Sequence, residues 1–189
     1  MSRLPEVSEQ DLDDEGRAFL ARLNDGPRGA RQGRIGMVGP YGVWARAPQI
    51  GEPTQQLGAA LRFGSSLSET VKEVVICTVA AFNEARFVFA AHRRLGLQAG
   101  LNDAALEQLR QGQVPALEGD EAVAWSVTQA LLEHHRVPEE QYRAALDAFG
   151  EQGLIELVTL AGYYTITSMT VNCFDVDLAP GMVDPFPDS

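Results

Sequence analysis

The stretch VKEVVICTVAAFNEARFVFAAHRRLGLQAG, residues 71–100, decides the fold. Its first twelve residues are apolar on nearly all sides, a pattern typical of a helix that is buried on every face. A buried parallel strand can show a similar run, but the length of this one and Ser68 as an N-cap before it favour a helix. We therefore expect a buried helix here, with the carboxyl group of Glu73 in apolar surroundings.

A second helix is expected to begin at Asn83, whose side chain can cap it, and to end near Leu95, just before Gly96. His92 lies on this second helix. Glu73 and His92 are nineteen residues apart, and one straight helix would separate them by about 28 Å. A turn at Asn83 lets the two helices face each other, so that the carboxylate and the imidazole can meet.

The rest of the chain also shows helical spacing, and no segment has the period-2 alternation of a half-buried strand. We expect an all-α fold, a single-domain bundle of about eight helices. Residues 1–48 would form an N-terminal helix, capped by Ser8, and a glycine-rich arm. Residues 49–178 would form the helical core, and residues 179–189 an irregular, proline-rich tail.

The glycine-rich arm is the least regular part of the chain. Residues 24–42 hold six glycines and two prolines, so no regular element is expected there. Arg28, Arg31 and Arg34 lie in this arm, and guanidinium and backbone N–H groups could together hold an anionic ligand. The spacing matches neither GxGxxG nor a P-loop, and a solvated loop or a subunit contact is the commoner role of such a segment.

Composition restricts the partners and the location. The 189-residue chain has a net charge of −11, which disfavours nucleic acid and anionic membrane surfaces as partners. Residues 157–174 are uncharged, but six Ser, Thr and Asn residues interrupt the run, so we expect a buried helix of a soluble fold. The N-terminus lacks the apolar segment of a secretory signal. We expect a cytoplasmic protein whose partner is a small-molecule substrate.

Cysteine and histidine spacing gives no metal site. Cys77 and Cys173 are 96 residues apart and no CxxC pair exists, so we expect two small, buried apolar residues in a reduced chain. His134 and His135 are adjacent and lie on different helix faces, which does not make a metal pair. We expect neither a metal nor an organic cofactor.

Glu73 and His92 are the candidate catalytic residues. A carboxyl group in an apolar helix has a raised pKa unless it is partnered, and one that titrates near neutral pH can act as a general base. The alternative is a structural ion pair with Lys72, Arg86 or Arg93. His92 could act as a general acid or base, or could hold Glu73 by a hydrogen bond.

Asn83, Arg86 and Tyr163 are the candidate substrate-binding residues. Asn83 and Arg86 could bind a substrate carboxylate, with helix capping and a surface ion pair as the alternatives. Tyr163 could line a pocket with its ring and its hydroxyl group, with core packing as the alternative.

Five segments occur in a characteristic order: GPRG at 26–29, RFGSSLSETVKEVVI at 62–76, AAHRRLGLQAGL at 90–101, FGEQGLIELVTLAGYYTITSMTVNCF at 149–174 and LAPG at 178–181. Together they resemble the carboxymuconolactone decarboxylase family, part of the alkylhydroperoxidase D-like superfamily. The resemblance implies an all-helical fold and a homo-oligomer, commonly a trimer or a hexamer. It also implies that the helices around Glu73 and His92 lie near subunit contacts.

The hydroperoxidase branch of that superfamily carries a CxxCxxxH motif, with a glutamate twelve residues before the first cysteine. Aligned on His92, the glutamate falls on Glu73 and the two cysteine positions fall on Ala85 and Val88. Peroxide reduction in that branch needs a thiolate and a resolving thiol, so a peroxidase of this type is not expected. Many decarboxylase-like members also carry an acidic residue four positions before the histidine, where this chain has Val88.

The resemblance implies acid–base chemistry, a decarboxylation or a related lyase step, on a small carboxylated or lactone-type substrate. Glu73 would be the base, and His92 the acid or the orienting group. One alternative is a non-catalytic helical protein that binds ligands or forms an oligomer, which the missing thiols and the missing acid at Val88 favour. Another is a peroxidase-related antioxidant without the CxxC site, which would need an exposed Cys77 of low pKa.

Overall fold

The computed structural model describes residues 2–5 and 7–187. Over these residues the chain forms one short 3-10 helix, nine α-helices and no strand, which confirms the all-α expectation. The elements of the first part are η1 (Glu9–Asp11), α1 (Asp14–Asp25), α2 (Pro27–Gln32), α3 (Pro40–Trp44) and α4 (Pro48–Phe63). Those of the second part are α5 (Glu69–Phe82), α6 (Arg86–Ala99), α7 (Asp103–Arg110), α8 (Gly119–His134) and α9 (Glu139–Cys173).

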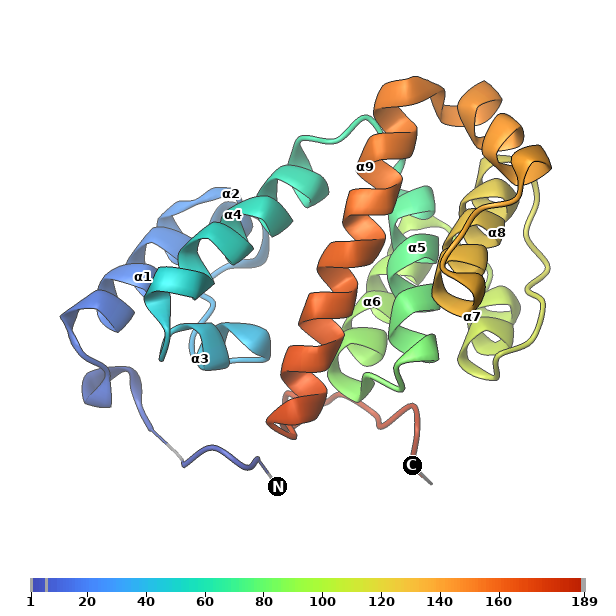
Figure 1. Ribbon diagram of the computed structural model, residues 1–189. Helices are drawn as coiled ribbons and strands as arrows, with labels where there is room; N and C mark the ends of the chain where they lie inside the picture. The colour runs from blue at the N-terminus through green and yellow to red at the C-terminus, as the bar shows by residue number, and fades with distance from the viewer. Residues whose placement is uncertain (1, 6, 188–189) are drawn as a thin grey trace.

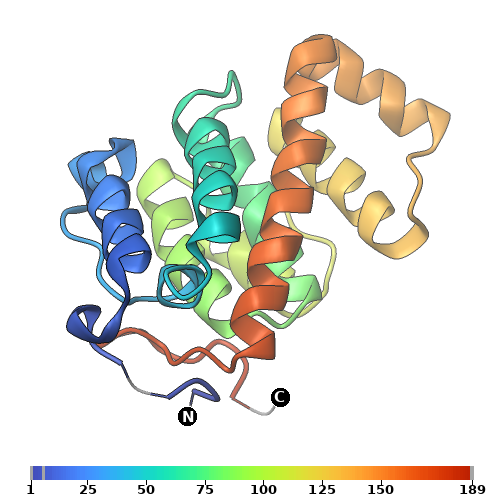
Figure 2. The same ribbon diagram turned by 60° about the vertical axis from the view of Figure 1, so that its left-hand side comes forward.

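The central helix is α5. Every residue from 71 to 80 is buried, and α5 packs against α6, α7, α8 and α9. Figures 1 and 2 show α9 in the middle of the molecule, with α1, α2 and α4 on one side and α7 and α8 on the other. The apolar stretch that opens the sequence analysis is therefore the core around which the other helices pack.

The turn between α5 and α6 is built differently from the expected N-cap at Asn83. Asn83 ends α5, and its side-chain amide donates a hydrogen bond back to the Val79 carbonyl at 2.8 Å. Glu84 then adopts a positive φ of 48°, and Ala85 precedes the first residue of α6. The turn still reverses the chain, so that α6 packs along α5.

Two further helix boundaries differ from the sequence expectation. Ser8 caps only the short η1, and α1 begins after Asp13, whose side chain accepts a hydrogen bond from the Gly16 N–H at 2.8 Å. The helix α6 continues through Gly96 and ends at Gly100, whose φ of 107° closes it in the left-handed conformation. The helix α9 changes direction at a kink on Gly150, whose φ is 66°.

The glycine-rich arm, residues 24–42, contains the short helix α2, in contrast to the expectation of irregular chain, and it ends in the first turn of α3. Pro27 and Pro40 each occupy the first turn of a helix, where the missing N–H of proline has no helical partner to lose. Gly29 allows α2 to fold back on α1, because a Cβ atom there would lie 1.9 Å from the Asn24 carbonyl oxygen. The prolines therefore start helices in this arm.

The contact between α4 and α9 depends on Gly58. A Cβ atom at Gly58 would lie 2.1 Å from the hydroxyl oxygen of the buried Tyr163. We expect Gly58→Ala to lower the free energy of unfolding by about 1–3 kcal/mol, as overpacked cores do. Gly162→Ala is the matched control, since a Cβ there meets nothing within 4 Å and should raise stability by about 0.5–1 kcal/mol. Urea unfolding followed by circular dichroism measures both changes, and equal effects would contradict this account.

The long helix α9 combines a buried face and an exposed one. It is long and apolar enough to cross a membrane by length and composition alone, but half of its most apolar window is buried in the bundle, as in the core helix of a soluble protein. Its outward face carries exposed apolar side chains: Ile155, Val158, Ile166 and Met169. Cys173 follows at helical spacing and is exposed, while Cys77 is buried. The expectation of two buried cysteines is therefore wrong for Cys173.

The C-terminal tail lies against α6. Arg86, the first residue of α6, pairs with Asp175 at 2.7 Å and with Asp184 at 3.1 Å. Phe186 packs edge-on against Phe89, with 5.4 Å between the ring centroids. The tail is irregular, as expected, and these side chains fix its position.

Candidate functional site

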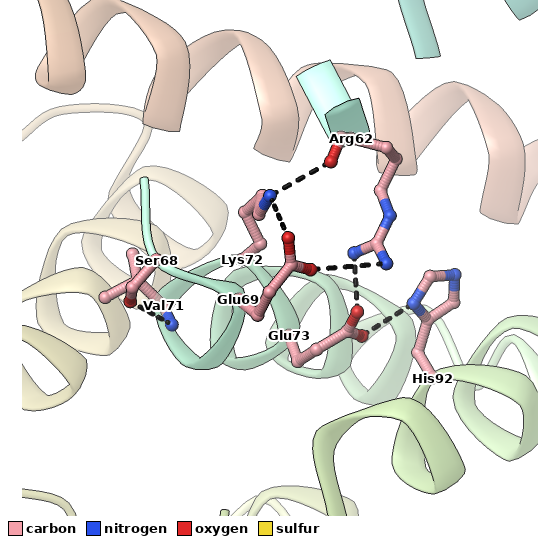
Figure 3. A network of polar contacts seen from close by, with 7 residues as sticks. All are labelled: Arg62, Ser68, Glu69, Val71, Lys72, Glu73 and His92. Atoms are coloured by element: carbon pink, nitrogen blue, oxygen red, sulfur yellow. Dashed lines mark hydrogen bonds and ion pairs between the residues drawn. The ribbon is translucent and has the colours of Figure 1, made fainter. Parts of the chain in front are cut away.

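Glu73 and His92 meet where α5 faces α6. His92 Nδ1 and Glu73 Oε2 are 2.7 Å apart, and Figure 3 shows the imidazole turned toward the carboxylate. Glu73 is 1% exposed. The chain reversal after α5 thus brings together two residues that one straight helix would hold far apart, as the sequence predicts.

Arg62, in the last turn of α4, is the third member of this group and is absent from the sequence candidates. Its Nη1 donates to Glu73 Oε1 at 2.5 Å, so each carboxylate oxygen has its own partner. Arg62 is 5% exposed, which makes this a buried ion pair. No helical periodicity links Arg62 to Glu73, because the two residues lie on different helices; its place in the segment 62–76 was the only signal for it.

The ion-pair partners expected for Glu73 bind elsewhere. Arg86 pairs with the C-terminal tail, and Arg93 pairs with Asp103. Lys72 donates to the backbone carbonyl of Arg62 at 2.9 Å and to a carboxylate oxygen of Glu69 at 2.7 Å.

The start of α5 is tied to the end of α4 by this network. The buried Lys72 bridges the Arg62 carbonyl and Glu69 (Figure 3). Ser68 Oγ caps α5 by accepting a hydrogen bond from the Val71 N–H at 3.2 Å, as the sequence predicts. These contacts fix the end of α4, which carries Arg62, against the start of α5, which carries Glu73.

Glu73 and His92 differ in charge state near neutral pH: the first is ionised and the second is neutral. Burial raises the pKa of Glu73, but the contacts with His92 and Arg62 outweigh burial and bring this pKa below its ordinary value. Burial lowers the pKa of His92, the Glu73 carboxylate offsets this only in part, and the positive charges of Arg62 and Arg28 lower it further. Near neutral pH, Glu73 is ionised and His92 is neutral, with its Nδ1–H donating to the carboxylate. Because Glu73 is partnered, the raised pKa expected for an unpartnered carboxyl group does not arise.

A cavity of about 490 Å³ lies against His92. His92 and Arg62 line it, whereas Glu73 is absent from its lining and lies behind them. The second ring nitrogen of His92 points away from Glu73 (Figure 3) and has no hydrogen bond within the described residues. A ligand in this cavity can therefore touch the imidazole but not the carboxylate.

Aromatic side chains form much of the cavity wall. Tyr164 packs edge-on against the His92 ring, with 4.9 Å between the centroids, and Tyr163 packs edge-on against Tyr164 at 5.1 Å. Burial raises the pKa of both tyrosines, so both keep their hydroxyl protons and can donate hydrogen bonds. Tyr163, a sequence candidate, does line the cavity, and so does its neighbour Tyr164.

Asn83 and Arg86 do not line the cavity. The side chain of Asn83 bonds back to its own helix, and its carbonyl oxygen accepts a hydrogen bond from Asn172 Nδ2 at 2.6 Å. The guanidinium group of Arg86 is engaged by Asp175 and Asp184. Arg86 thus makes the ion pairs that were its alternative role, whereas Asn83 bonds back to α5 and does not cap α6. The geometry does not support the assignment of either residue to substrate binding.

No cysteine reaches the cavity among the residues that the structure describes. Burial and the nearby Glu73 carboxylate raise the pKa of Cys77 well above its ordinary value, so this thiol stays protonated and enclosed. Val88 lines the cavity at one of the two aligned thiol positions, and Ala85 occupies the other. Within residues 2–5 and 7–187, no group of three or more His, Cys, Asp and Glu residues could hold a metal ion.

Comparison with known proteins identifies the fold. No family model matches the sequence, and no curated protein matches it. Among solved structures, a peroxidase-related protein with an alkylhydroperoxidase AhpD core from Ralstonia eutropha matches with a TM-score of 0.77 and 14% identity, over 95% of this chain and 93% of that one. A peroxidase-related protein from Silicibacter sp. matches with a TM-score of 0.74 and 14% identity, over 96% of this chain and 93% of that one.

A debrominase solved in complex with 2,3,4-tribromopyrrole also matches. Its TM-score is 0.69 at 13% identity, over 95% of both chains. At such identities the likeness establishes the architecture and leaves the chemistry to the side chains. The chain therefore has the AhpD-like all-α fold.

Proposed function

We propose that this protein is a small enzyme of the carboxymuconolactone decarboxylase type that uses acid–base chemistry. The reaction would be a decarboxylation or a related lyase step on a small carboxylated or lactone-type molecule, without a metal, an organic cofactor or a thiol. One observation carries this proposal: a neutral His92 lies at the cavity wall, backed by the buried and ionised Glu73. A neutral imidazole oriented by a carboxylate is a competent general base.

The roles within the pair follow from access to the cavity. The unbonded ring nitrogen of His92 would take a proton from the carbon next to a substrate carbonyl, and the electron pair of that C–H bond would move onto the carbonyl oxygen. Glu73 would stabilise the imidazolium that forms, and Arg62 would keep Glu73 ionised. In a decarboxylation, His92 would instead take the proton of the substrate carboxyl group that is lost. The electrons of the breaking C–C bond then move into the conjugated carbonyl system as carbon dioxide leaves, and His92 returns that proton to the carbon atom. Glu73 thus becomes the orienting group, and His92 the base.

The fold neighbours support a small-molecule-converting function in general terms. The debrominase complex holds a small ring compound in a protein of this architecture. The peroxidase-related names of other neighbours favour the antioxidant alternative, but that chemistry requires an accessible thiolate. Cys77 is buried with a raised pKa, so acid–base chemistry on His92 is the better match.

We expect turnover to survive the loss of both thiols. Purified protein would be incubated with 4-carboxymuconolactone and with related unsaturated lactones and carboxylates, and carbon dioxide release and substrate absorbance would be followed. The Cys77→Ala/Cys173→Ala variant should keep the wild-type rate, since neither thiol reaches His92. Loss of turnover in this variant would favour thiol chemistry instead. Absence of turnover on every compound in the wild type would favour the non-catalytic alternative.

The remaining expectations extend this proposal. We propose a cytoplasmic homo-oligomer, a trimer or a hexamer, with a small-molecule substrate and with neither nucleic acid nor a membrane as partner. The acidic net charge of −11 supports the last part.

A further inference from the structure

Arg28, near the start of α2, is a buried cation that has no ion pair among the described residues. It is only 5% exposed, and its Nε and Nη2 atoms are enclosed and have no hydrogen-bond partner within the same part of the chain. Aromatic rings hold its guanidinium group, with the Tyr41 centroid at 5.3 Å and the Phe63 centroid at 5.5 Å. Cation–π contacts of this kind fix the position of an arginine, but they leave the N–H groups on its edge unsatisfied. Buried polar groups without a partner are rare in folded proteins and call for an explanation.

The cavity that Arg28 lines is positively charged, although the chain as a whole is acidic. None of its described lining residues is an Asp or a Glu. Five of them are arginines: Arg28, Arg31, Arg34, Arg62 and Arg94. Arg62 is paired with Glu73, and Arg34 is paired with Glu9. The other three have no ion pair within the part of the chain that the structure describes. A cavity with such a surplus of positive charge favours an anionic ligand.

The two unsatisfied atoms of Arg28 define the shape of that anion. Nε and Nη2 lie on the same edge of the planar guanidinium group, and two N–H groups on one edge match the two oxygens of a carboxylate. Both atoms on this edge are buried away from water. A small rotation of the side chain toward the cavity would therefore exchange an unsatisfied position for a doubly hydrogen-bonded one.

We propose that the cavity is a binding site for a small aromatic or conjugated carboxylate, with Arg28 as the residue that anchors its carboxylate. The aromatic wall of Tyr41, Phe87, Tyr163 and Tyr164 favours a flat, unsaturated body next to the charged group. The volume of about 490 Å³ suits one small ring compound. This inference rests on the proposed function, since the anchored carboxylate leaves the rest of the ligand to face His92.

The test compares carboxylates with their uncharged amides. Isothermal titration calorimetry would measure the binding of benzoate, cinnamate and 2-furoate, each beside its amide, to the full-length protein. We expect each carboxylate that binds to do so more tightly than its amide. Arg28→Gln should weaken carboxylate binding about 30-fold or more, the effect typical of removing one member of a buried charge pair. Arg28→Lys should fall between the two, because it keeps the charge and loses the fork. Arg143→Gln, which removes an exposed arginine of α9, is the matched control and should bind like the wild type.

Stability separates ligand binding from a structural role. Arg28→Gln should melt at or above the wild-type temperature without ligand, because it removes an unpaired buried charge, and benzoate should raise the melting temperature of the wild type alone. Equal affinity for carboxylates and amides, or wild-type carboxylate binding in Arg28→Gln, would overturn the inference.

His92→Gln should still bind the carboxylate. A carboxylate preference that depends on Arg28, in a protein without turnover, would leave this inference standing and overturn the proposed function. Turnover that depends on His92, with carboxylates and amides bound equally, would do the reverse.

Discussion

Replacing Glu73 by leucine is expected to lower the free energy of unfolding by about 3–5 kcal/mol, the largest stability effect that we expect from a single substitution in this chain. The change removes the carboxylate that pairs with the buried guanidinium group of Arg62, which then keeps only its contact with Glu69 at 3.9 Å. It also removes the hydrogen-bond partner of His92 Nδ1. Arg62 cannot lose its proton to escape this cost, because the pKa of a guanidinium group is too high. Urea unfolding at neutral pH measures the loss directly.

A double substitution distinguishes lost charge pairing from lost packing. Arg62→Met/Glu73→Leu removes both charges at once, and we expect it to recover most of the stability, since replacing a whole buried ion pair by apolar groups is often close to neutral. A remaining deficit of about 1–3 kcal/mol is expected from the unpaired imidazole N–H. The control is Glu139→Leu, whose ion pair with Arg143 is exposed and contributes less than about 1 kcal/mol. A double variant as unstable as the sum of the single variants would contradict the buried-pair account.

Replacing His92 by glutamine is expected to lower kcat by about 10²–10⁴-fold on any substrate that the wild type turns over, the usual contribution of a general base. Glutamine keeps a hydrogen-bonding side chain near Glu73 but cannot take up a proton. Steady-state kinetics of both proteins would measure the loss. An unchanged rate would exclude His92 as the base.

The pH dependence of the wild type gives an independent readout. His92 must be neutral to accept a proton, and its pKa lies below the ordinary value of 6.5. The rate kcat/KM should therefore exceed half of its plateau value at pH 6.5 and should fall as the pH drops through the lowered pKa. Glu73→Gln removes the negative charge that raises this pKa, so it should move the acidic limb to still lower pH. A limb centred above pH 6.5 would contradict the assignment.

The same shift affects stability with a definite sign. The folded chain holds His92 with a lowered pKa, so below pH 6.5 the unfolded chain binds a proton more readily than the folded one. The stability that the neutral imidazole contributes is thus complete above pH 6.5 and declines as the pH falls. The lowered pKa of Glu73 adds a second decline, which begins below its ordinary value of 4.5.

The sequence predicts what depends on patterns within one helix or on neighbouring helices. The all-round apolar character of α5 predicts its burial, and Ser68 predicts its start, because both signals are local. The contact between Glu73 and His92 could also be predicted, since a reversal near Asn83 lets the two consecutive helices face each other. Asn83 itself is misassigned because its side chain satisfies a carbonyl of the helix it ends, which is the alternative bonding that such residues offer.

Other parts of the site depend on contacts that no pattern encodes. Arg62 reaches Glu73 across a loop between two helices, and the charge states of both titratable groups follow from that contact. Arg28 lies in an arm that looks irregular by composition, and only the packing of Tyr41 and Phe63 around it reveals that it is buried. Arg86 is drawn away from substrate binding by two aspartates that lie about ninety residues later in the chain.

The position of the C-terminal tail has a practical consequence. Met182 forms part of the cavity wall, and the segment around it is held in place by side-chain contacts of Asp184 and Phe186 rather than by a helix. The shape of the binding site is therefore completed by a segment that has no regular secondary structure of its own. Recombinant forms that carry an affinity tag at this end, or that proteases have trimmed there, would keep the helical core and lose part of the ligand wall. For ligand screening, a tag at the opposite terminus is the safer choice.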